Sequence, residues 1–284
     1  MNIVSVHEHH CSICPIAKQS RLPFPTSLSH SVSVFDIIHG DVWGPYRVPN
    51  HDGKRYFLTL VDDMSRYTWI FLLHTKSDTV VVLKDFVNLV RNQFGVGIKC
   101  IRTDNGTEFV NNQMDDLFKA NGIVHQSSCV YTPQQNGVVE RKHRSILDMA
   151  RALRFQAGVP LLFWGFCFTN PVYILNRLPT VLLQGQSAFE KLFGQVPSLQ
   201  HLRVFGSLCY ATDPKILDKF APRVVPAVHM GYSMNKKGYI LYDLTCKSFF
   251  ISRDTVFKED IFPFKNLKSF PDHLFPVLDL HDSS

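Results

Sequence analysis

The chain has 284 residues, 45% of them hydrophobic, which is enough apolar material for one or two buried cores. Charged residues make up 19% and the formal net charge is +6, so the composition disfavours a disordered chain and permits nucleic-acid binding without proving it. The seven cysteines are an odd number, which argues against a secreted disulfide framework. Without a signal-peptide core or an apolar run of about 18 residues, we expect a nuclear or cytoplasmic protein with no transmembrane segment.

The first half of the chain alternates between strand-like and helix-like patterns. Three consecutive β-rich runs predict antiparallel strands at 34–42, 56–61 and 67–73. Helical periodicity and capping signals then predict helices at 79–94, 111–120 and 138–156, with short strands at 98–102 and 123–126 and a loop at 127–137. The later alternation of strands and helices implies that the last two strands join the sheet in parallel. We therefore expect an α/β fold with a mixed five-stranded sheet and flanking helices.

The pattern changes after Pro160. Two helical segments, 161–176 and 188–193, precede short strands at 204–212, 227–232, 239–243 and 248–251. Strands of this length and spacing suggest a small β-barrel.

Metal-assisted phosphoryl transfer requires hard oxygen ligands on rigid elements, because two divalent ions must stabilise the attacking and leaving oxygens. Asp41, Asp104 and Glu140 all lie near predicted element ends, and we expect Asp41 to end its strand. Each of them alone is equally consistent with a turn or cap residue. Spacing does not separate them from other carboxylates near element ends, namely Asp36, Asp62, Asp63, Asp115 and Asp116.

Four longer motifs contain these three carboxylates together with Asp62, Asp63 and Glu108. They are HGDVWGP (39–45), VDDMSRYTW (61–69), RTDNGTEF (102–109) and YTPQQNGVVERKHR (131–144). Together they resemble the catalytic core of copia-type LTR retrotransposon integrases. The resemblance implies a ribonuclease H-like fold and a catalytic, metal-binding triad of Asp41, Asp104 and Glu140, in which 35 residues separate the last two.

The resemblance also implies a chemistry and its partners. The cofactor would be Mg²⁺ or Mn²⁺, as two ions, and the reactions 3′-end processing and strand transfer. The partners would be double-stranded DNA, as element ends and target, and further copies of the chain in an active homo-oligomer.

Several other residues have a predicted role near the triad. Asp62 and Asp63 are expected to organise the turn between the second and third strands, and Glu108 to begin a helix. On the long helix, Lys142 and Arg144 are candidates for DNA phosphate contacts, although an intrahelical ion pair of Arg144 with Glu140 is an equal alternative. In the preceding loop, Tyr131 is a candidate for stacking on DNA.

Cys11 and Cys14 have the spacing of half a zinc site. The related integrases carry a histidine pair further upstream, which this sequence lacks, so Zn²⁺ binding is not the favoured expectation. We expect a truncated zinc-binding remnant and linker at 1–33, a catalytic core at 34–160, a helical connector at 161–202, an SH3-like β-barrel at 203–260 and a tail at 261–284.

The sequence leaves three functions open. An integrase core is the leading hypothesis, and the chain resembles a fragment of a longer polyprotein. The alternative is a truncated retroelement relic that binds nucleic acid without integrating it. A ribonuclease H hydrolase would share the fold and the metals, but TPQQNGV (132–138) argues against it.

Overall fold

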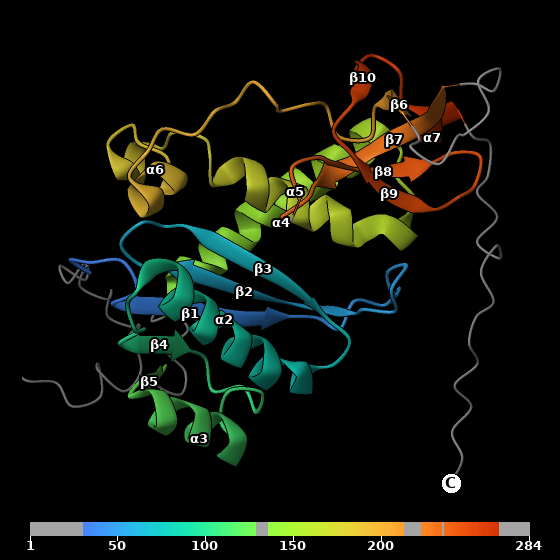
Figure 1. Cartoon of the computed structure of the whole chain (residues 1–284). Coiled ribbons are helices and arrows are strands. Elements are labelled where there is room, and N and C mark those ends of the chain that lie inside the picture. The colour runs from blue at the N-terminus through green and yellow to red at the C-terminus, as the bar shows by residue number, and fades with distance from the viewer. Residues whose placement is uncertain (1–30, 129–135, 213–222, 235, 267–284) are drawn as a thin grey trace, which may run out of the picture. The chain divides into compact units, whose positions relative to one another are not determined.

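The computed structural model describes residues 31–128, 136–212, 223–234 and 236–266. Within these ranges the chain forms two five-stranded sheets with helices around and between them (Figure 1). No helix among the described residues has the length and apolar character needed to cross a membrane.

The first sheet has the strand order β3-β2-β1-β4-β5. Its strands are β1 (Ile37–Trp43), β2 (Tyr56–Asp62), β3 (Thr68–Leu73), β4 (Cys100–Thr103) and β5 (Val124–Ser127). Short turns join the first three strands, so these pair antiparallel, whereas helical crossovers make β4 and β5 parallel to β1. The mixed sheet predicted from the sequence is confirmed.

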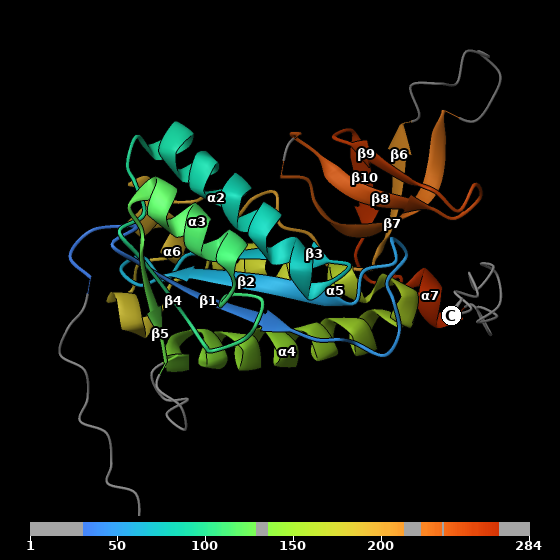
Figure 2. The ribbon, with the colours of Figure 1, turned by 90° about the horizontal axis from the view of Figure 1, so that it is seen from below.

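Three helices cover this sheet: α2 (Thr79–Phe94), α3 (Asn112–Asn121) and α4 (Gly137–Ala157). Figure 2 shows α2 and α3 on one face and α4 on the other. Side chains of a strand alternate between faces, so Ile38 and Leu58 enter the core under α2, whereas Phe57 packs with Ile146 of α4. By the same alternation, the odd-numbered residues of β1 face α4.

A connector follows α4 and joins the two sheets. It contains η3 (Leu161–Phe163), α5 (Trp164–Leu175), η4 (Val181–Leu183) and α6 (Ala188–Phe193). Near the end of α5, the amide of Asn176 bonds both the backbone N–H and the carbonyl of Thr68 in β3. From the same helix, Asn170 donates to the carbonyl of Met230 in the second sheet, at 2.8 Å. Buried side-chain amides therefore attach the connector to both sheets.

The second sheet is antiparallel, with the order β10-β6-β7-β8-β9. Its strands are β6 (Leu208–Thr212), β7 (Val224–Tyr232), β8 (Tyr239–Asp243), β9 (Phe249–Ser252) and β10 (Thr255–Lys258), and α7 (Pro263–Asn266) follows them. In the part of the chain that the structure describes, β9 and β10 are not paired with each other, so the predicted barrel is not closed by hydrogen bonds.

Candidate active site

Asp41 lies inside β1 and not at its end, because the strand continues to Trp43. The expectation that Asp41 ends its strand is therefore wrong. β1 pairs with β2 along its length, and Asp41 faces Thr59 there. On the other side, the pairing with β4 stops at His39 and Arg102, and β4 itself ends at Thr103. Asp41 thus lies within a continuous β1, beside the point where the adjacent strand β4 ends.

Asp104 follows β4 directly and begins a tight turn. One of its carboxylate oxygens, Oδ1, accepts a hydrogen bond from the backbone N–H of Gly106 at 3.0 Å. The next residue, Asn105, donates to the carbonyl of Ser128 at 2.7 Å, which ties the turn to the chain leaving β5. Parallel β1 and β4 therefore present Asp41 and Asp104 from adjacent strands of one sheet.

Glu140 is exposed in the first turn of α4, where the helix dipole favours a carboxylate. The start of this helix is fixed to β1 by Asn136, which is buried and donates to the carbonyl of Gly40 at 3.2 Å. Gly40 immediately precedes Asp41. A single hydrogen bond between residues 96 positions apart thus brings the beginning of α4 beside Asp41.

The three carboxylates share one electrostatic environment. Burial is the main reason why the pKa of Asp41 rises from 3.8 to about 6, and the negative charges of Asp104, Glu140 and Glu108 raise it further. Asp104, Glu140 and Glu108 are thus near enough to Asp41 for their charges to act on its carboxylate. We call these four carboxylates the acidic cluster.

His143 is a site residue that the sequence analysis did not single out. It is 7% exposed, and its Nδ1 lies 3.3 Å from Oδ2 of Asp41. Burial lowers the pKa of His143 to about 4, so the ring is neutral at neutral pH. One signal was present in the sequence: His143 lies at helical spacing with Val139 and Ile146, which marks it as part of the buried face of α4.

Asp62 and Asp63 have the structural role predicted for them. Buried Asp62 accepts hydrogen bonds from the backbone N–H groups of Phe35 and Ser65 and from the Ser65 hydroxyl. Asp63 contacts Nε2 of His39 at 2.8 Å and Nη1 of Arg66 at 3.2 Å. Both side chains organise the β2–β3 turn and its junction with β1.

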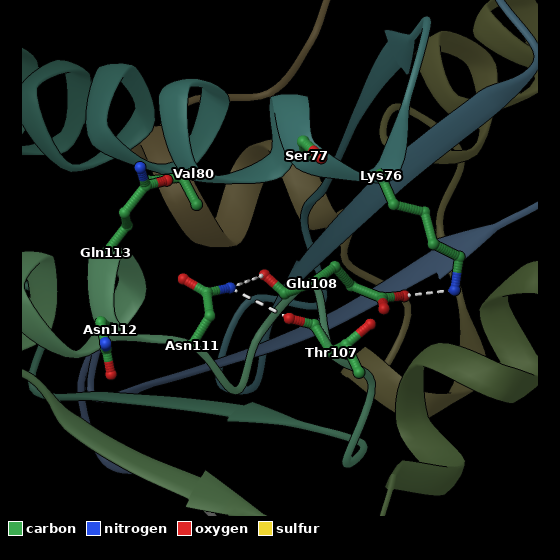
Figure 3. Close-up of a pocket in the computed structure, with 8 residues that line it drawn as sticks. All are labelled: Lys76, Ser77, Val80, Thr107, Glu108, Asn111, Asn112 and Gln113. Carbon is green, nitrogen blue, oxygen red and sulfur yellow. Dashed lines mark hydrogen bonds and ion pairs between the residues drawn. The ribbon is translucent and has the colours of Figure 1, made fainter. Parts of the chain in front are cut away.

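Glu108 does not begin a helix, contrary to expectation, because α3 starts only at Asn112. It lies in the turn after Asp104, is almost fully buried, and pairs through Oε1 with Nζ of Lys76 at 2.8 Å (Figure 3). The pair borders a cavity of about 430 Å³ between the first turns of α2 and α3. The other lining residues are Ser77, Val80, Thr107, Asn111, Asn112 and Gln113.

Residues 32–133 match the Integrase core domain family, and residues 207–270 match the Retroviral polymerase SH3-like domain family. Two similar plant proteins are the Pol polyproteins of transposon RE1 from Arabidopsis thaliana, 38% identical over 90% of this chain, and of transposon TNT 1-94 from Nicotiana tabacum, 34% identical over 88%. The chain contains an integrase core domain and a retroviral SH3-like domain, and its relatives are copia-type Pol polyproteins. It spans only 17 to 19% of the length of these two polyproteins.

More distant proteins also match this chain in sequence or in fold. The Ty1-DR6 Gag-Pol polyprotein of Saccharomyces cerevisiae is 25% identical over 84% of this chain, which covers 14% of that protein. A cryo-EM structure of the simian T-cell lymphotropic virus intasome with PP2A regulatory subunit B56 gamma aligns with a TM-score of 0.53 at 14% identity. That alignment covers 90% of this chain and 89% of the other, and it shows likeness of fold.

The match to the integrase core family ends before Glu140, so it includes Asp41 and Asp104 but not the third carboxylate. Integrase family membership implies the use of a divalent metal. Carboxylate oxygens are the ligands that Mg²⁺ and Mn²⁺ prefer, and the raised pKa of Asp41 shows a repulsion that a cation would relieve. Among the described residues, however, no three His, Cys, Asp or Glu side chains are close enough to hold an ion together. The oxygen donors of a divalent-metal site are therefore present, but the described side chains are not gathered around one point.

The structure separates the candidate DNA-contacting residues of the integrase core. Arg144 is exposed, and in the described ranges it forms no ion pair with Glu140. Lys142 is half-buried, and burial, with a smaller effect of the Arg66 charge, lowers its pKa. Residues two apart on a helix point to different sides, so Lys142 does not share the flank of Glu140. Tyr131, Cys11 and Cys14 lie outside the described residues.

Proposed function

We propose that this chain is the catalytic core of a retrotransposon integrase that performs divalent-metal-dependent phosphoryl transfer on DNA. The observation that supports this proposal most strongly is geometric: adjacent parallel strands carry Asp41 and Asp104, and the Asn136–Gly40 hydrogen bond holds the start of the Glu140 helix beside them, within an integrase core fold. The proposed reactions are 3′-end processing, in which water attacks a phosphodiester, and strand transfer, in which the new 3′-hydroxyl attacks target DNA. Neither reaction involves a covalent enzyme intermediate.

Each residue of the proposed site has a distinct task. Asp41, Asp104 and Glu140 would hold two Mg²⁺ or Mn²⁺ ions. Such ions activate the attacking oxygen and neutralise charge at the phosphate when bound. The Nδ1 atom of His143 lies 3.3 Å from Asp41 and orients that carboxylate, and Asn136 positions the helix that carries Glu140.

The proposed partner is double-stranded DNA, as both element end and target, bound by a homo-oligomer of the chain in the nucleus or cytoplasm. Arg144 supports this proposal because it is an exposed guanidinium on the helix of Glu140, one turn further along. Lys142 and Tyr131 remain candidates for DNA contacts. We assign catalysis to 34–160 and assembly or DNA contacts to the SH3-like region, 203–260, with 161–202 connecting them.

Strand transfer with a labelled donor end, in Mg²⁺ and separately in Mn²⁺, tests the proposed function. The wild type is expected to join donor to target, whereas Asp104→Asn and Glu140→Gln should fall to background because each removes a metal-binding charge. Filter binding of the same DNA is the parallel measurement, and all three proteins are expected to bind. A wild type as inactive as the two variants, with DNA binding intact, would identify the chain as a relic that binds nucleic acid without integrating it.

A further inference from the structure

The acidic cluster around Asp41 contains one carboxylate beyond the triad, Glu108. Its two oxygen atoms differ in their contacts. Oxygen Oε1 is occupied by the ammonium group of Lys76 at 2.8 Å. The other oxygen, Oε2, is buried and has no hydrogen-bond partner among the described residues, in a side chain that is 3% exposed. A buried acceptor without a donor destabilises a folded protein, so such an atom calls for a functional explanation.

The free oxygen of Glu108 lies next to the carboxylate of Asp104. A Cβ atom at position 106, where the chain has glycine, would lie 2.7 Å from Oε2 of Glu108 and 3.0 Å from Oδ1 of Asp104. Both oxygens are that close to one point, so they lie no more than about 6 Å apart. This close approach also explains the glycine, because any larger residue at position 106 would strike both carboxylates.

Lys76 keeps Glu108 in this position without shielding it completely. Its side chain is 44% exposed and comes from η1 (Lys76–Asp78), the short helix that follows β3. Figure 3 shows the two side chains extended toward each other, with the Glu108 carboxylate turned away from Asn111 and Gln113. The ammonium thus fixes one oxygen of Glu108 and leaves the other facing the aspartate.

We propose that Glu108 is a positioning residue of the metal site, whose free oxygen accepts a hydrogen bond from the hydration shell of a cation held by Asp104. Magnesium and manganese ions bound by few carboxylates keep several water ligands, and these waters are the donors that Oε2 lacks. Mutation of a residue that hydrogen-bonds to the ligands of a metal ion commonly lowers the metal affinity by about 10- to 100-fold. The inference rests on the proposed function, since it assumes that the triad binds a divalent cation.

Calorimetric titration of the full chain with Mn²⁺ alone tests this inference, beside the melting temperature of each protein in EDTA. Glu108→Gln is expected to weaken Mn²⁺ binding about tenfold or more, with no loss of melting temperature in EDTA. The matched control is Asp148→Asn, which makes the same change of charge in an exposed pair with Arg151 on α4 and should leave the affinity unchanged. Lys76→Met should also change the Mn²⁺ affinity, because it releases the Glu108 oxygen that the ammonium group holds and removes a positive charge beside the cluster.

Other results would contradict the inference in recognisable ways. If Glu108→Gln lowers the melting temperature in EDTA and binds Mn²⁺ as tightly as Asp148→Asn, the Lys76–Glu108 pair is only structural. If Glu108→Gln fails to fold, an unchanged Mn²⁺ affinity of Lys76→Met would lead to the same conclusion. A wild type that binds no Mn²⁺ would overturn the proposed function, and this inference with it.

Discussion

At the scale of single residues, Asp41 has a pKa well above that of a carboxylate in water. Burial and three neighbouring carboxylates raise its pKa to about 6, so the folded protein binds this proton more tightly than the unfolded chain does. The free energy of unfolding therefore falls as the pH rises from about 4 to about 6, because ionised Asp41 is destabilising in the absence of a cation.

Asp41→Asn is therefore expected to stabilise the metal-free protein while abolishing strand transfer. At pH 7.5 in EDTA the gain should be no more than about 3 kcal/mol, since one pKa unit corresponds to about 1.4 kcal/mol. The measurement is urea denaturation at pH 7.5 and at pH 4, where the gain should largely vanish because Asp41 is then protonated. An equal difference at both pH values would show that the charge of Asp41 is not responsible.

A second prediction at this scale concerns Arg144. If its exposed guanidinium contacts a DNA phosphate, Arg144→Ala should weaken DNA binding and reduce the slope of log Kd against log salt concentration by about one unit. Arg151→Ala is the control, because Arg151 lies on the same helix but is paired with Asp148 at 3.2 Å. An unchanged salt dependence for Arg144→Ala would exclude the phosphate contact.

At the scale of elements, most strands and helices follow from local patterns. Apolar alternation and helical periodicity predicted β1 to β5 and α2 to α4 within a few residues. The first strand was expected from residue 34 but begins at Ile37, because Phe35 adopts a left-handed backbone with φ of 65°. β10 was missed because Thr255–Lys258 is short and becomes a strand only by pairing with β6, which no local pattern reveals.

The candidate site was less accessible to sequence reasoning than the fold. Family motifs pointed to Asp41, Asp104 and Glu140, but the roles of Asn136 and His143 depend on contacts across the sheet face. Glu108 was expected to begin a helix, whereas its burial and its pairing with Lys76 come from tertiary structure. Long-range contacts of polar groups leave little trace in local spacing.

The attachment of α4 to β1 gives a prediction at this scale. Asn136→Ala removes the hydrogen bond to the Gly40 carbonyl and should lower the free energy of unfolding by about 1 kcal/mol. Strand transfer should fall about tenfold or more, because small displacements of catalytic groups are costly. The control is Ser187→Ala, which removes the N-cap of α6 and should cost about 1 kcal/mol without slowing the reaction. Equal strand-transfer rates for the two variants would argue against a positioning role for Asn136.

At the scale of the described molecule, one apolar cluster is shared by both sheets. Ile146 of α4 and Met230 of β7 are fully buried in it, together with Phe57 of β2 and Phe163 of the connector. The buried amides of α5 reinforce the junction. We therefore expect the catalytic core and the SH3-like region to unfold together.

Differential scanning calorimetry tests this expectation. Ile146→Ala and Met230→Ala should each lower the melting temperature of a single transition, because each removes about 2–5 kcal/mol of packing. Met234→Ala should have little effect, since that side chain is 74% exposed. Two separate transitions, each sensitive to only one of the buried substitutions, would show that the regions fold independently.

The hydrogen bond between Asn136 and Gly40 also bears on when activity can arise during synthesis. It closes a chain separation of 96 residues, and it brings the helix of Glu140 to the strand of Asp41, which lies in an equally distant segment. Contacts of such high sequence separation form late, because the intervening chain must first be ordered. A nascent polypeptide that has not yet released α4 thus has both aspartates but no complete site. Catalytic competence would therefore report that the whole core has been made and folded.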